Sequence, residues 1–536
     1  MEQDVIQLDV AVVGAGFAGL YLVKKLRDLS FSVKAFDAES DIGGTWLRNR
    51  YPGLRCDVES LQYCYSFSED LEEEWDWTER FSPRDDILHY INYVADRFDL
   101  RRDVQLNTRI VSAHFQDQDD HWLLRTEQGG KIRSRFCIMA TGCLSDAHLP
   151  KIAGMQSFDG TTLHTANWPS NRPDLKGKKV GVLGTGSSGV QIIPELAEEA
   201  GQLYVFQRTP AYVVPARNAA ISDEQKLHWK ANFRDFRRIA KEKSATGSFM
   251  KVPQKSALAV SPTEREEIYA KAWERGGPEF TWVFSDLVTS DDANETAGAF
   301  VRQRIRETVR NPEVAERLTP RSYPIFSKRI CVGTNYYETF NRENVTLVDL
   351  REAPIVEMTA AGLRTENAFY DLDVMVFATG YDAFTGALKH IDIRGAGRRS
   401  LSEAWQNGPT CYLGIMAANF PNLFFITGPG SPSVLSNVVI SIEQHVEWIA
   451  DCLTKLREMG VSKMEATKEA EAEWQLEVQR AAAETVYTRA QSWYSGANVE
   501  GKPNIFLPYA GGVGRYRAIC NDVVRNNFQG FVLTKK

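Results

Sequence analysis

The chain has 536 residues, of which 43% are hydrophobic and 25% are charged, and its formal net charge is −7. This length predicts several domains, and the composition is typical of a globular protein with a large core. The acidic balance gives no reason to expect a nucleic-acid partner, because such proteins usually carry a basic patch or stripe.

Signals for membranes, export and metals are missing from the pattern. No run of about 18 apolar residues can serve as a spanning helix, and the acidic first residues are unlike those of a signal peptide. The eight cysteines form no C-x-x-C pair, and the eight histidines form no H-x-x-x-H pair. We therefore expect a soluble, cytoplasmic protein with reduced thiols, no membrane partner and no metal site.

The first glycine motif lies close to the N-terminus. An expected strand, residues 8–13, runs into a G-x-G-x-x-G motif and a helical pattern, and a second strand, residues 32–36, ends at Asp37. The motif glycines are Gly14, Gly16 and Gly19. Such a turn lets the backbone approach a pyrophosphate at the positive end of a helix, while the acid binds ribose hydroxyls. We predict a dinucleotide site, assigned to FAD by analogy with other two-dinucleotide flavoproteins; an ordinary glycine turn is the alternative.

Two later strands end in the same tripeptide. The expected strand 136–139 is followed by Ala140-Thr141-Gly142, and the strand 374–377 is followed by Ala378-Thr379-Gly380. We interpret these paired segments as the two points where the chain passes between domains.

A second strand–glycine–helix pattern starts at the strand 179–183. Its motif residues are Gly184, Gly186, Ser187, Ser188 and Gly189, and the helix is expected from Val190. The following strand, 203–206, ends without an acid and leads to Arg208 and Thr209. A guanidinium can hold a 2′-phosphate through two parallel hydrogen bonds, whereas a carboxylate would repel it. We predict an NADPH site; a solvated surface arginine is the alternative.

Helical patterns fill much of the remaining chain. Residues 222–321 are rich in Glu, Lys, Arg and Ala at helical spacing, and residues 465–489 predict one amphipathic helix. We expect an α/β fold with two Rossmann-like dinucleotide-binding domains and a helical insertion. The predicted limits are 1–145 and 383–536 for the FAD domain, 146–221 and 322–382 for the NADPH domain, and 222–321 for the insertion.

Three further segments carry a family resemblance. Residues 158–169 match the pattern F-x-G-x-x-x-H-T-x-x-W-P, residues 44–57 match G-x-W-x-x-x-x-Y-P-G-x-x-x-D, and residues 373–381 match D-x-x-x-x-A-T-G-Y. The fingerprint positions are Phe158, Gly160, His164, Thr165, Trp168 and Pro169. Together they resemble the Baeyer–Villiger monooxygenases, and most closely the phenylacetone, cyclohexanone and steroid monooxygenase group. Flavin-containing monooxygenases share both glycine motifs, but their fingerprint typically ends in Tyr or Phe where this chain has Trp168-Pro169.

The resemblance implies a reaction and its central residues. FAD, NADPH and dioxygen would convert a ketone to an ester or lactone through a flavin C4a-peroxide and a tetrahedral peroxy adduct, with sulfoxidation as a further activity. Arg329 would be the fixed cation that stabilises the anionic flavin peroxide and the negatively charged adduct. Asp57 would be the charged partner that a buried arginine needs. Lys328 would help to bind the 2′-phosphate. Without the resemblance, a Lys-Arg pair is more often solvated.

Other positions receive roles from the same resemblance. Gly44, Thr45, Trp46 and Tyr51 would lie at the flavin, although both aromatic residues also fit a plain core. Gln191 either orients the nicotinamide or lies on a helix surface, and His164 is expected to link the domains, with proton transfer as the alternative.

A loop around Trp493 and a substrate pocket complete the expected site. In the family, the Trp493 region is a mobile loop that folds over NADP, which would stay bound through oxygenation; a surface loop is the alternative. The implied substrate-pocket residues are Val58, Cys143, Leu144, Ser433, Val434, Leu435 and Val438. The length of the 430–437 segment resembles the phenylacetone-oxidising relatives, which indicates a bulky or aromatic ketone.

Three other function classes compete with this interpretation. An N- or S-hydroxylating flavin monooxygenase would not need Arg329. A pyridine-nucleotide disulfide reductase would need a redox cysteine pair, but Cys56 and Cys64 are eight residues apart. A non-enzymatic flavin scaffold would leave Arg329 and the fingerprint unexplained. The expected partners are a small-molecule ketone and dioxygen, and we expect a monomer or a weak oligomer.

Overall fold

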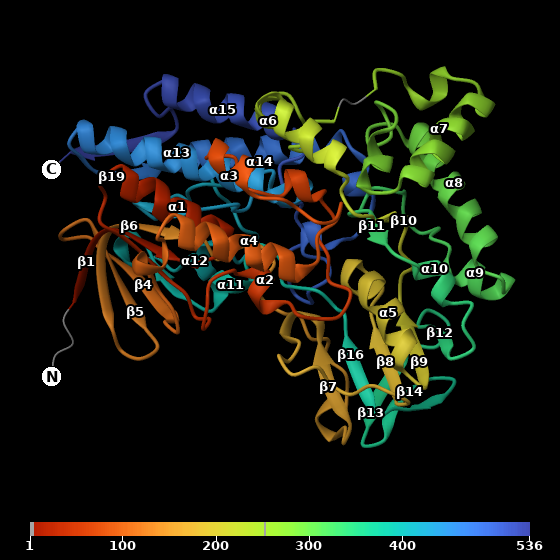
Figure 1. Cartoon of the computed structure of the whole chain (residues 1–536). Coiled ribbons are helices and arrows are strands. Elements are labelled where there is room, and N and C mark those ends of the chain that lie inside the picture. The colour runs from red at the N-terminus through yellow and green to blue at the C-terminus, as the bar shows by residue number, and fades with distance from the viewer. Residues whose placement is uncertain (1–4, 251–252, 536) are drawn as a thin grey trace.

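The computed structural model describes residues 5–250 and 253–535, and a large sheet organises both ends of this chain (Figure 1). This eight-stranded sheet has the order β17-β4-β5-β6-β1-β2-β3, and β18 also pairs with β6. Strands β6, β1, β2 and β3 are parallel, whereas β4 and β5 form an antiparallel extension. The strands are β1 (Ile6–Val13), β2 (Val33–Phe36), β3 (Val104–Gln105), β4 (Ile110–Gln116), β5 (His121–Thr126), β6 (Lys131–Met139), β17 (Asp392–Arg394) and β18 (Leu423–Phe425).

A second, fully parallel sheet contains five strands in the order β12-β9-β8-β16-β7. The strands are β7 (Thr161–His164), β8 (Lys179–Leu183), β9 (Gln202–Gln207), β12 (Val345–Asp349) and β16 (Val374–Phe377). The chain leaves the first sheet after β6 and returns after β16, which are the two crossings predicted from the sequence. The α/β class with two nucleotide-binding sheets is confirmed, while the exact domain limits remain a prediction.

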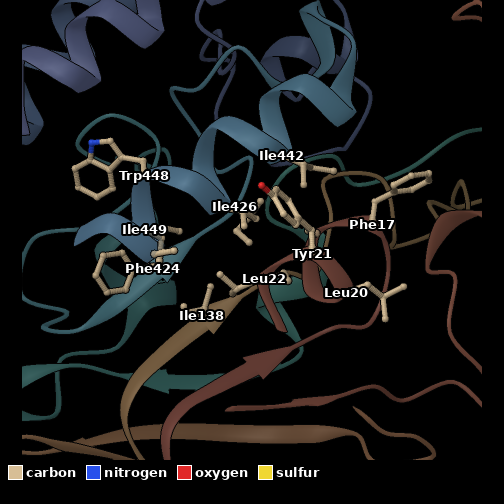
Figure 2. Close-up of a cluster of buried hydrophobic side chains, with 14 of the residues drawn as sticks. Phe17, Leu20, Tyr21, Leu22, Ile138, Phe424, Ile426, Ile442, Trp448 and Ile449 are labelled. Atoms are coloured by element: carbon tan, nitrogen blue, oxygen red, sulfur yellow. The ribbon is translucent and has the colours of Figure 1, made fainter. Parts of the chain in front are cut away.

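The core of the first unit joins the two ends of the chain. Helix α1 (Phe17–Asp28) follows β1, and α13 (Val438–Glu458) lies against it. Figure 2 shows their side chains meeting those of β6 and β18, with Leu22, Ile138, Phe424 and Ile449 all buried. Full burial of each such side chain contributes about 1.5–3 kcal/mol. The N-terminal strands therefore depend on the C-terminal third for their cover.

The helical insertion is confirmed as a series of four helices between β10 (Val213–Pro215) and β11 (Cys331–Gly333). They are α6 (Asp223–Glu242), α7 (Pro262–Arg275), α8 (Asp291–Thr308) and α9 (Pro312–Leu318). Each begins after a residue whose side-chain oxygen accepts a backbone N–H, namely Ser222, Ser261, Ser290 and Asn311. Figure 1 shows α7–α9 as a lobe at one side, whereas α6 extends back over the first unit, against α13 and α15 (Val513–Arg525).

The predicted helix over 465–489 is too long at both ends. Helix α14 covers Lys468–Ala483, because Thr467 caps its first turn and Glu465 belongs to β19 (Val461–Ala466), which pairs with β20 (Phe531–Lys535). A separate turn follows at 486–489, capped by Thr485. Helix α5 (Ser187–Glu199) likewise begins at Ser187 rather than Val190.

Shorter elements complete the fold. No helix in the described ranges is long and apolar enough to cross a membrane. All eight cysteines are buried and free. The remaining elements are α2 (Thr45–Arg48), α3 (Glu69–Glu74), α4 (Arg84–Arg97), α10 (Tyr336–Thr339), α11 (Gly386–Lys389), α12 (Leu401–Ala404), β13 (Ile355–Thr359), β14 (Gly362–Thr365) and β15 (Phe369–Asp371).

Candidate active site

The first glycine turn between β1 and α1 is packed too tightly for any side chain. Gly14 has φ +110°, and a Cβ there would lie 2.5 Å from the carbonyl oxygen of Ala140. A Cβ on Gly19 would lie 1.9 Å from the oxygen of Gly14. At the end of β2, Asp37 accepts a hydrogen bond from the backbone N–H of Ala15, so the carboxylate is fixed beside the turn. This geometry fits the pyrophosphate and ribose of a dinucleotide such as FAD.

The second turn, between β8 and α5, repeats the same construction. Gly184 has φ +114°, and its Cβ would lie 2.5 Å from the carbonyl oxygen of Ala378. Gly189 packs against Gly184 in the same way, whereas a Cβ on Gly186 would meet nothing within 4 Å. The exposed Ser187 opens the helix N-terminus beside this space. The turn therefore leaves room for a phosphate group at the positive end of α5.

Arg208 and Lys328 form a positive region near this second turn. Arg208 is exposed, and Lys328 is half-buried with its Nζ 4.3 Å from the centre of the Tyr323 ring. Burial, followed by the positive charge of Arg208, lowers the pKa of Lys328. Within the described residues neither cation has a carboxylate partner. Two neighbouring cations without a counter-charge favour a bound anion, which fits the predicted 2′-phosphate.

The Y-P-G segment connects the first unit to the second nucleotide helix. The hydroxyl of Tyr51 donates to Oε1 of Gln191 at 2.8 Å, and Nε2 of Gln191 donates to the carbonyl oxygen of Arg55 at 3.0 Å. A Cβ on Gly53 would lie 2.6 Å from the backbone oxygen of Gln191. Gln191 is therefore part of an interdomain contact and is not a free surface residue.

Trp46 and Gly44 lie at the start of this segment, and Gly44 is next to the first glycine turn. Trp46 is buried, and its indole N–H donates to the hydroxyl of Tyr63 at 3.3 Å. Gly44 approaches Gly16 so closely that a Cβ on Gly44 would lie 3.1 Å from the Gly16 Cα. Thr45 starts the short helix α2. The flavin roles of Gly44, Thr45 and Trp46 remain predictions.

The fingerprint starts at Phe158, just before β7, and continues through β7, which pairs with β16. Phe158 packs over Gly160, Trp168 is buried, Pro169 is exposed, and Thr165 donates to the carbonyl oxygen of Phe377. His164 pairs with Phe377 in register; its Nδ1 accepts the N–H of Ala166, and its Nε2 lies 3.3 Å from the carbonyl oxygen of His148. Burial lowers the pKa of His164, so the ring is neutral near pH 7. These contacts favour the linking role over proton transfer.

Arg329 and Asp57 meet across 272 residues of sequence to form a two-point ion pair. Nε of Arg329 donates to one carboxylate oxygen of Asp57 at 2.5 Å, and Nη2 donates to the other at 2.7 Å. Nη1 donates to the carbonyl oxygen of Val434 at 2.9 Å. A guanidinium has five N–H groups, so two remain without a partner in the described chain. These two donors are available to a ligand.

The charges of this pair are stable over the usual pH range. Burial alone would raise the pKa of Asp57, but the adjacent Arg329 charge and hydrogen bonds lower it below its ordinary value. Burial would likewise lower the pKa of Arg329, and Asp57 raises it above its ordinary value. The side chains are 27% and 24% exposed, respectively. The arrangement is therefore a fixed cation whose partner keeps it oriented.

A cavity of about 130 Å³ lies beside this pair. Both members line it, together with Lys328, Phe326 and Trp282. Of the predicted substrate-pocket residues, Val58, Val434 and Leu435 line the cavity. Cys143 and Leu144 pack behind the last two, the hydroxyl of Ser433 donates to Cys143 Sγ, and Val438 starts α13. The sequence-predicted set thus divides into a lining group and a supporting group.

Sequence reasoning missed the rest of the lining. Tyr487 and Tyr494 close one side, and the polar residues Glu59, Gln62, Glu279 and Thr281 also face the cavity. Tyr494 belongs to a segment that already resembled the family, so its position could have suggested a site role. Glu279 lies in the insertion, where no local pattern distinguishes it.

The segment around Trp493 is held against the domain crossing. Lys502, whose side chain is 4% exposed, donates from Nζ to Asp382 and to the carbonyl oxygen of Ala383. The amide of Asn498 donates to the carbonyl oxygen of Tyr381 at 2.8 Å. Trp493 is half-buried, with its ring 4.5 Å from that of Tyr494. Its predicted contact with NADP remains a prediction.

The pH dependence of the free energy of unfolding tests how the cavity affects the charge of Glu279. Its carboxylate is 8% exposed; burial and the charge of Glu59 raise its pKa from 4.5 to about 7, against the opposing charges of Arg80 and Arg275. The folded protein then binds more protons than the unfolded chain between these values, so its stability falls as the pH rises through this window. We expect Glu279→Gln to remove the loss and to be more stable than the parent by roughly 1–3 kcal/mol at about pH 8.

Denaturant unfolding between about pH 5 and pH 8 measures this difference. The control is Glu274→Gln, because Glu274 is an exposed carboxylate paired with Arg217. The control should follow the parent at each pH. A Glu279→Gln variant that keeps the parent's pH dependence would contradict the assignment.

Two nucleotide turns between parallel strands, with an arginine–carboxylate pair facing a cavity, define a flavoprotein that binds two dinucleotides. The flavin-binding monooxygenase-like family model matches residues 7–224. Over its length the chain belongs to the Baeyer–Villiger monooxygenase family and is an FAD- and NADPH-dependent monooxygenase.

Three similar proteins show the range of known relatives. A Baeyer–Villiger monooxygenase of Pseudooceanicola batsensis is 40% identical over 98% of this chain and 96% of its own length. A phenazine N-monooxygenase of Lysobacter antibioticus is 39% identical over 99% and 98%. The structure of an oxidised steroid monooxygenase bound to NADP has a TM-score of 0.94 and 46% identity, and covers 99% of this chain and 100% of its own.

Proposed function

We propose that this enzyme oxidises a ketone to an ester or lactone, with Arg329 as the cation that supports oxygen insertion. The observation that carries the proposal is the Arg329–Asp57 pair at the cavity wall, which leaves two guanidinium N–H groups without a partner in the described chain. The ketone carbonyl gains negative charge when it is attacked, and a fixed cation in an enclosed site stabilises that charge.

The chain's own residues divide the remaining tasks. When bound, FAD supplies activated oxygen and NADPH supplies the electrons. FAD would be held by the first glycine turn and the acid after β2, namely Gly14, Gly16, Gly19 and Asp37. The pyrophosphate and ribose of NADPH would be held by the second turn and the end of β9, namely Gly184, Gly186, Ser187, Ser188, Gly189 and Thr209. Tyr51 and Gln191 would keep the two binding units in register through their hydrogen bond. The cavity would exclude bulk water, which protects reactive oxygen from unproductive decay.

Finer features belong to the same proposal. We expect a bulky or aromatic ketone between Val58, Val434 and Leu435, because these apolar side chains line the cavity beside Arg329. NADP⁺ would stay bound during oxygenation under the Trp493 segment. We propose a cytoplasmic monomer or weak oligomer that also oxidises thioethers.

Oxygenation of nitrogen is the second candidate function, and the phenazine N-monooxygenase relative favours keeping it. It would need an electrophilic oxygen and would not require the Arg329 cation. The two candidates separate in one experiment. The FAD-loaded enzyme receives NADPH, ¹⁸O₂ and either a ketone or an aromatic N-heterocycle. Our proposal requires ester that contains one ¹⁸O atom from the gas; N-oxide without any ester would overturn it.

Arg208→Ala tests the nucleotide assignment. Loss of a charge-assisted contact to the 2′-phosphate should raise the Michaelis constant for NADPH about tenfold or more. The constant for NADH, which lacks that phosphate, should change little. Steady-state NAD(P)H oxidation measures both values. Arg217→Ala is the control, because Arg217 is also an exposed arginine and pairs with Glu274. Equal effects of Arg208→Ala on both nucleotides would remove the argument for the 2′-phosphate.

A further inference from the structure

Tyr494 is a buried residue at the cavity wall whose phenol oxygen has no hydrogen-bond partner within the described residues. Tyr494 is 2% exposed, and it lines the same cavity as Arg329. Its backbone is fully engaged, because its N–H donates to Ser492 Oγ and its carbonyl oxygen accepts the N–H of Leu507. Across the described residues no hydrogen-bond partner exists for the phenol oxygen. A hydroxyl at a cavity wall that has no partner in the protein can bond to a ligand in that cavity.

Aromatic packing fixes the direction of this ring. Tyr494 lies edge-on to Tyr487, at 88°, and to Phe506, at 77°. Tyr487 and Phe506 are themselves stacked, with an angle of 17° between their planes. Trp493 covers Tyr494 from a further side. Rotating the phenol out of the cavity would disturb this packing, so the hydroxyl is a preorganised group.

The charge of Arg329 also acts on the Tyr494 phenol. Burial raises the pKa of Tyr494, and the Arg329 charge opposes the rise without cancelling it. The phenol therefore keeps its proton at working pH and can donate it in a hydrogen bond. Tyr487 also lines the cavity, and the Arg329 charge lowers its pKa against the larger effect of burial. Of these two tyrosines, only Tyr494 is among the groups that influence the pKa of Arg329 in return.

We propose that the Tyr494 hydroxyl donates a hydrogen bond to the carbonyl oxygen of the ketone, so that this oxygen is held between the phenol and the free N–H groups of Arg329. This makes Tyr494 a further catalytic residue, and it rests on the proposed ketone oxidation. No proton is transferred in this step: the O–H bond stays intact and strengthens its contact as negative charge grows on the carbonyl oxygen. Two donors on one oxygen would fix the carbonyl in the plane needed for attack, which neither donor does alone.

Tyr494→Phe is the direct test, since it removes only the hydroxyl. The FAD-loaded variant should form ester from cyclohexanone with a kcat lowered about tenfold or more, while NADPH oxidation without ketone stays near the parent rate. Tyr269→Phe is the control, because it removes the hydroxyl of a buried tyrosine that bonds to Thr296 in the insertion and does not line the cavity; its ester formation should stay within about twofold of the parent. Equal losses in both variants would overturn the assignment to Tyr494.

A spectroscopic measurement reads the hydrogen bond without turnover. Cyclohexanone labelled with ¹³C at the carbonyl is bound to the oxidised enzyme with FAD and NADP⁺, and isotope-difference infrared spectra record its C=O stretch. The stretch should lie at lower wavenumber in the parent than in Tyr494→Phe, because a donated hydrogen bond weakens the carbonyl bond. The same frequency in both proteins would overturn the inference. If the parent forms no ester from any ketone, the proposed function itself fails, and this outcome is distinct from an unaltered Tyr494→Phe.

Discussion

Arg329→Ala should bind FAD and oxidise NADPH, yet release hydrogen peroxide in place of ester. The nucleotide turns lie at Gly14 and Gly184 and do not involve this side chain. The developing negative charge on the substrate, in contrast, would lose its fixed cation. Removing one preorganised donor to such a charge typically costs about 100- to 1,000-fold in rate. We therefore expect ester formation to fall by this factor while NADPH consumption continues.

Three assays on the same sample measure this uncoupling: NADPH absorbance, peroxide by a coupled peroxidase, and ester by gas chromatography. Arg306→Ala is the control, because Arg306 pairs with Glu316 on the insertion at 2.6 Å and does not line the cavity. Arg329→Lys keeps a cation but not the two-point contact with Asp57, so its ester yield should lie between those of the parent and the alanine variant. Ester yields in Arg329→Ala equal to those of the parent would end the catalytic assignment.

Asp57→Ala should leave the cation in place but without its orientation. Both N–H contacts from Arg329 to the carboxylate would be lost, and only the contact to the Val434 carbonyl oxygen would remain. A displacement of the guanidinium by about 1 Å is enough to lower the rate of ester formation about 100-fold. Because the pair is partly exposed, its loss should also cost roughly 1–3 kcal/mol of folding stability, between the values for surface and buried pairs.

The control separates stability from catalysis. Glu72→Ala breaks the pair between Glu72 and Arg237, whose side chains are 2% and 8% exposed. It should destabilise the protein at least as much as Asp57→Ala, yet keep the ratio of ester to peroxide near that of the parent. Chemical unfolding and product analysis on both variants give the comparison. Equal loss of that ratio in Glu72→Ala would show that instability alone explains the effect of Asp57→Ala.

The stability contribution of Asp57 also has a defined pH sign. Its folded pKa is lowered by Arg329, so the pair contributes stability above the unfolded carboxyl value of about 3.9. That contribution is lost as the pH falls through the lower, folded pKa. The parent should therefore lose its advantage over Asp57→Ala in acid, while the difference between the two proteins stays constant around neutral pH.

The sequence predicted the fold well where residues close together in the chain determine the backbone conformation. Gly14 and Gly184 must adopt positive φ under a neighbouring carbonyl oxygen, and this requirement is visible as strand, glycines and helix within about 20 residues. The helical character of the insertion was visible from its composition and spacing, whereas its individual helices and their caps came from the structure. Thr467 as the start of α14 was missed, because pairing of Glu465 with β20 overrides the helical propensity of the preceding residues.

The site could be predicted only in part. Arg329 and Asp57 are 272 residues apart, so no local rule pairs them, and the family resemblance was needed to bring them together. The possible roles of Glu279 and Tyr494 follow from the cavity, which is lined by six segments that are far apart in the sequence. Cys143, Leu144 and Ser433 have the apolar or small character of a lining, and only the packing shows that they stand behind it. Val438 packs against the core of the first unit instead.

The two Ala-Thr-Gly crossings have a mechanical consequence. The carbonyl oxygens of Ala140 and Ala378 approach Gly14 and Gly184, respectively, so closely that a Cβ on either glycine would lie 2.5 Å from the oxygen. These two segments also connect the unit of the first sheet to the unit of the second sheet, so a rotation between the units would take place about them. We therefore expect a rotation between the two units to displace both glycine turns, which would couple nucleotide binding to the angle between the units.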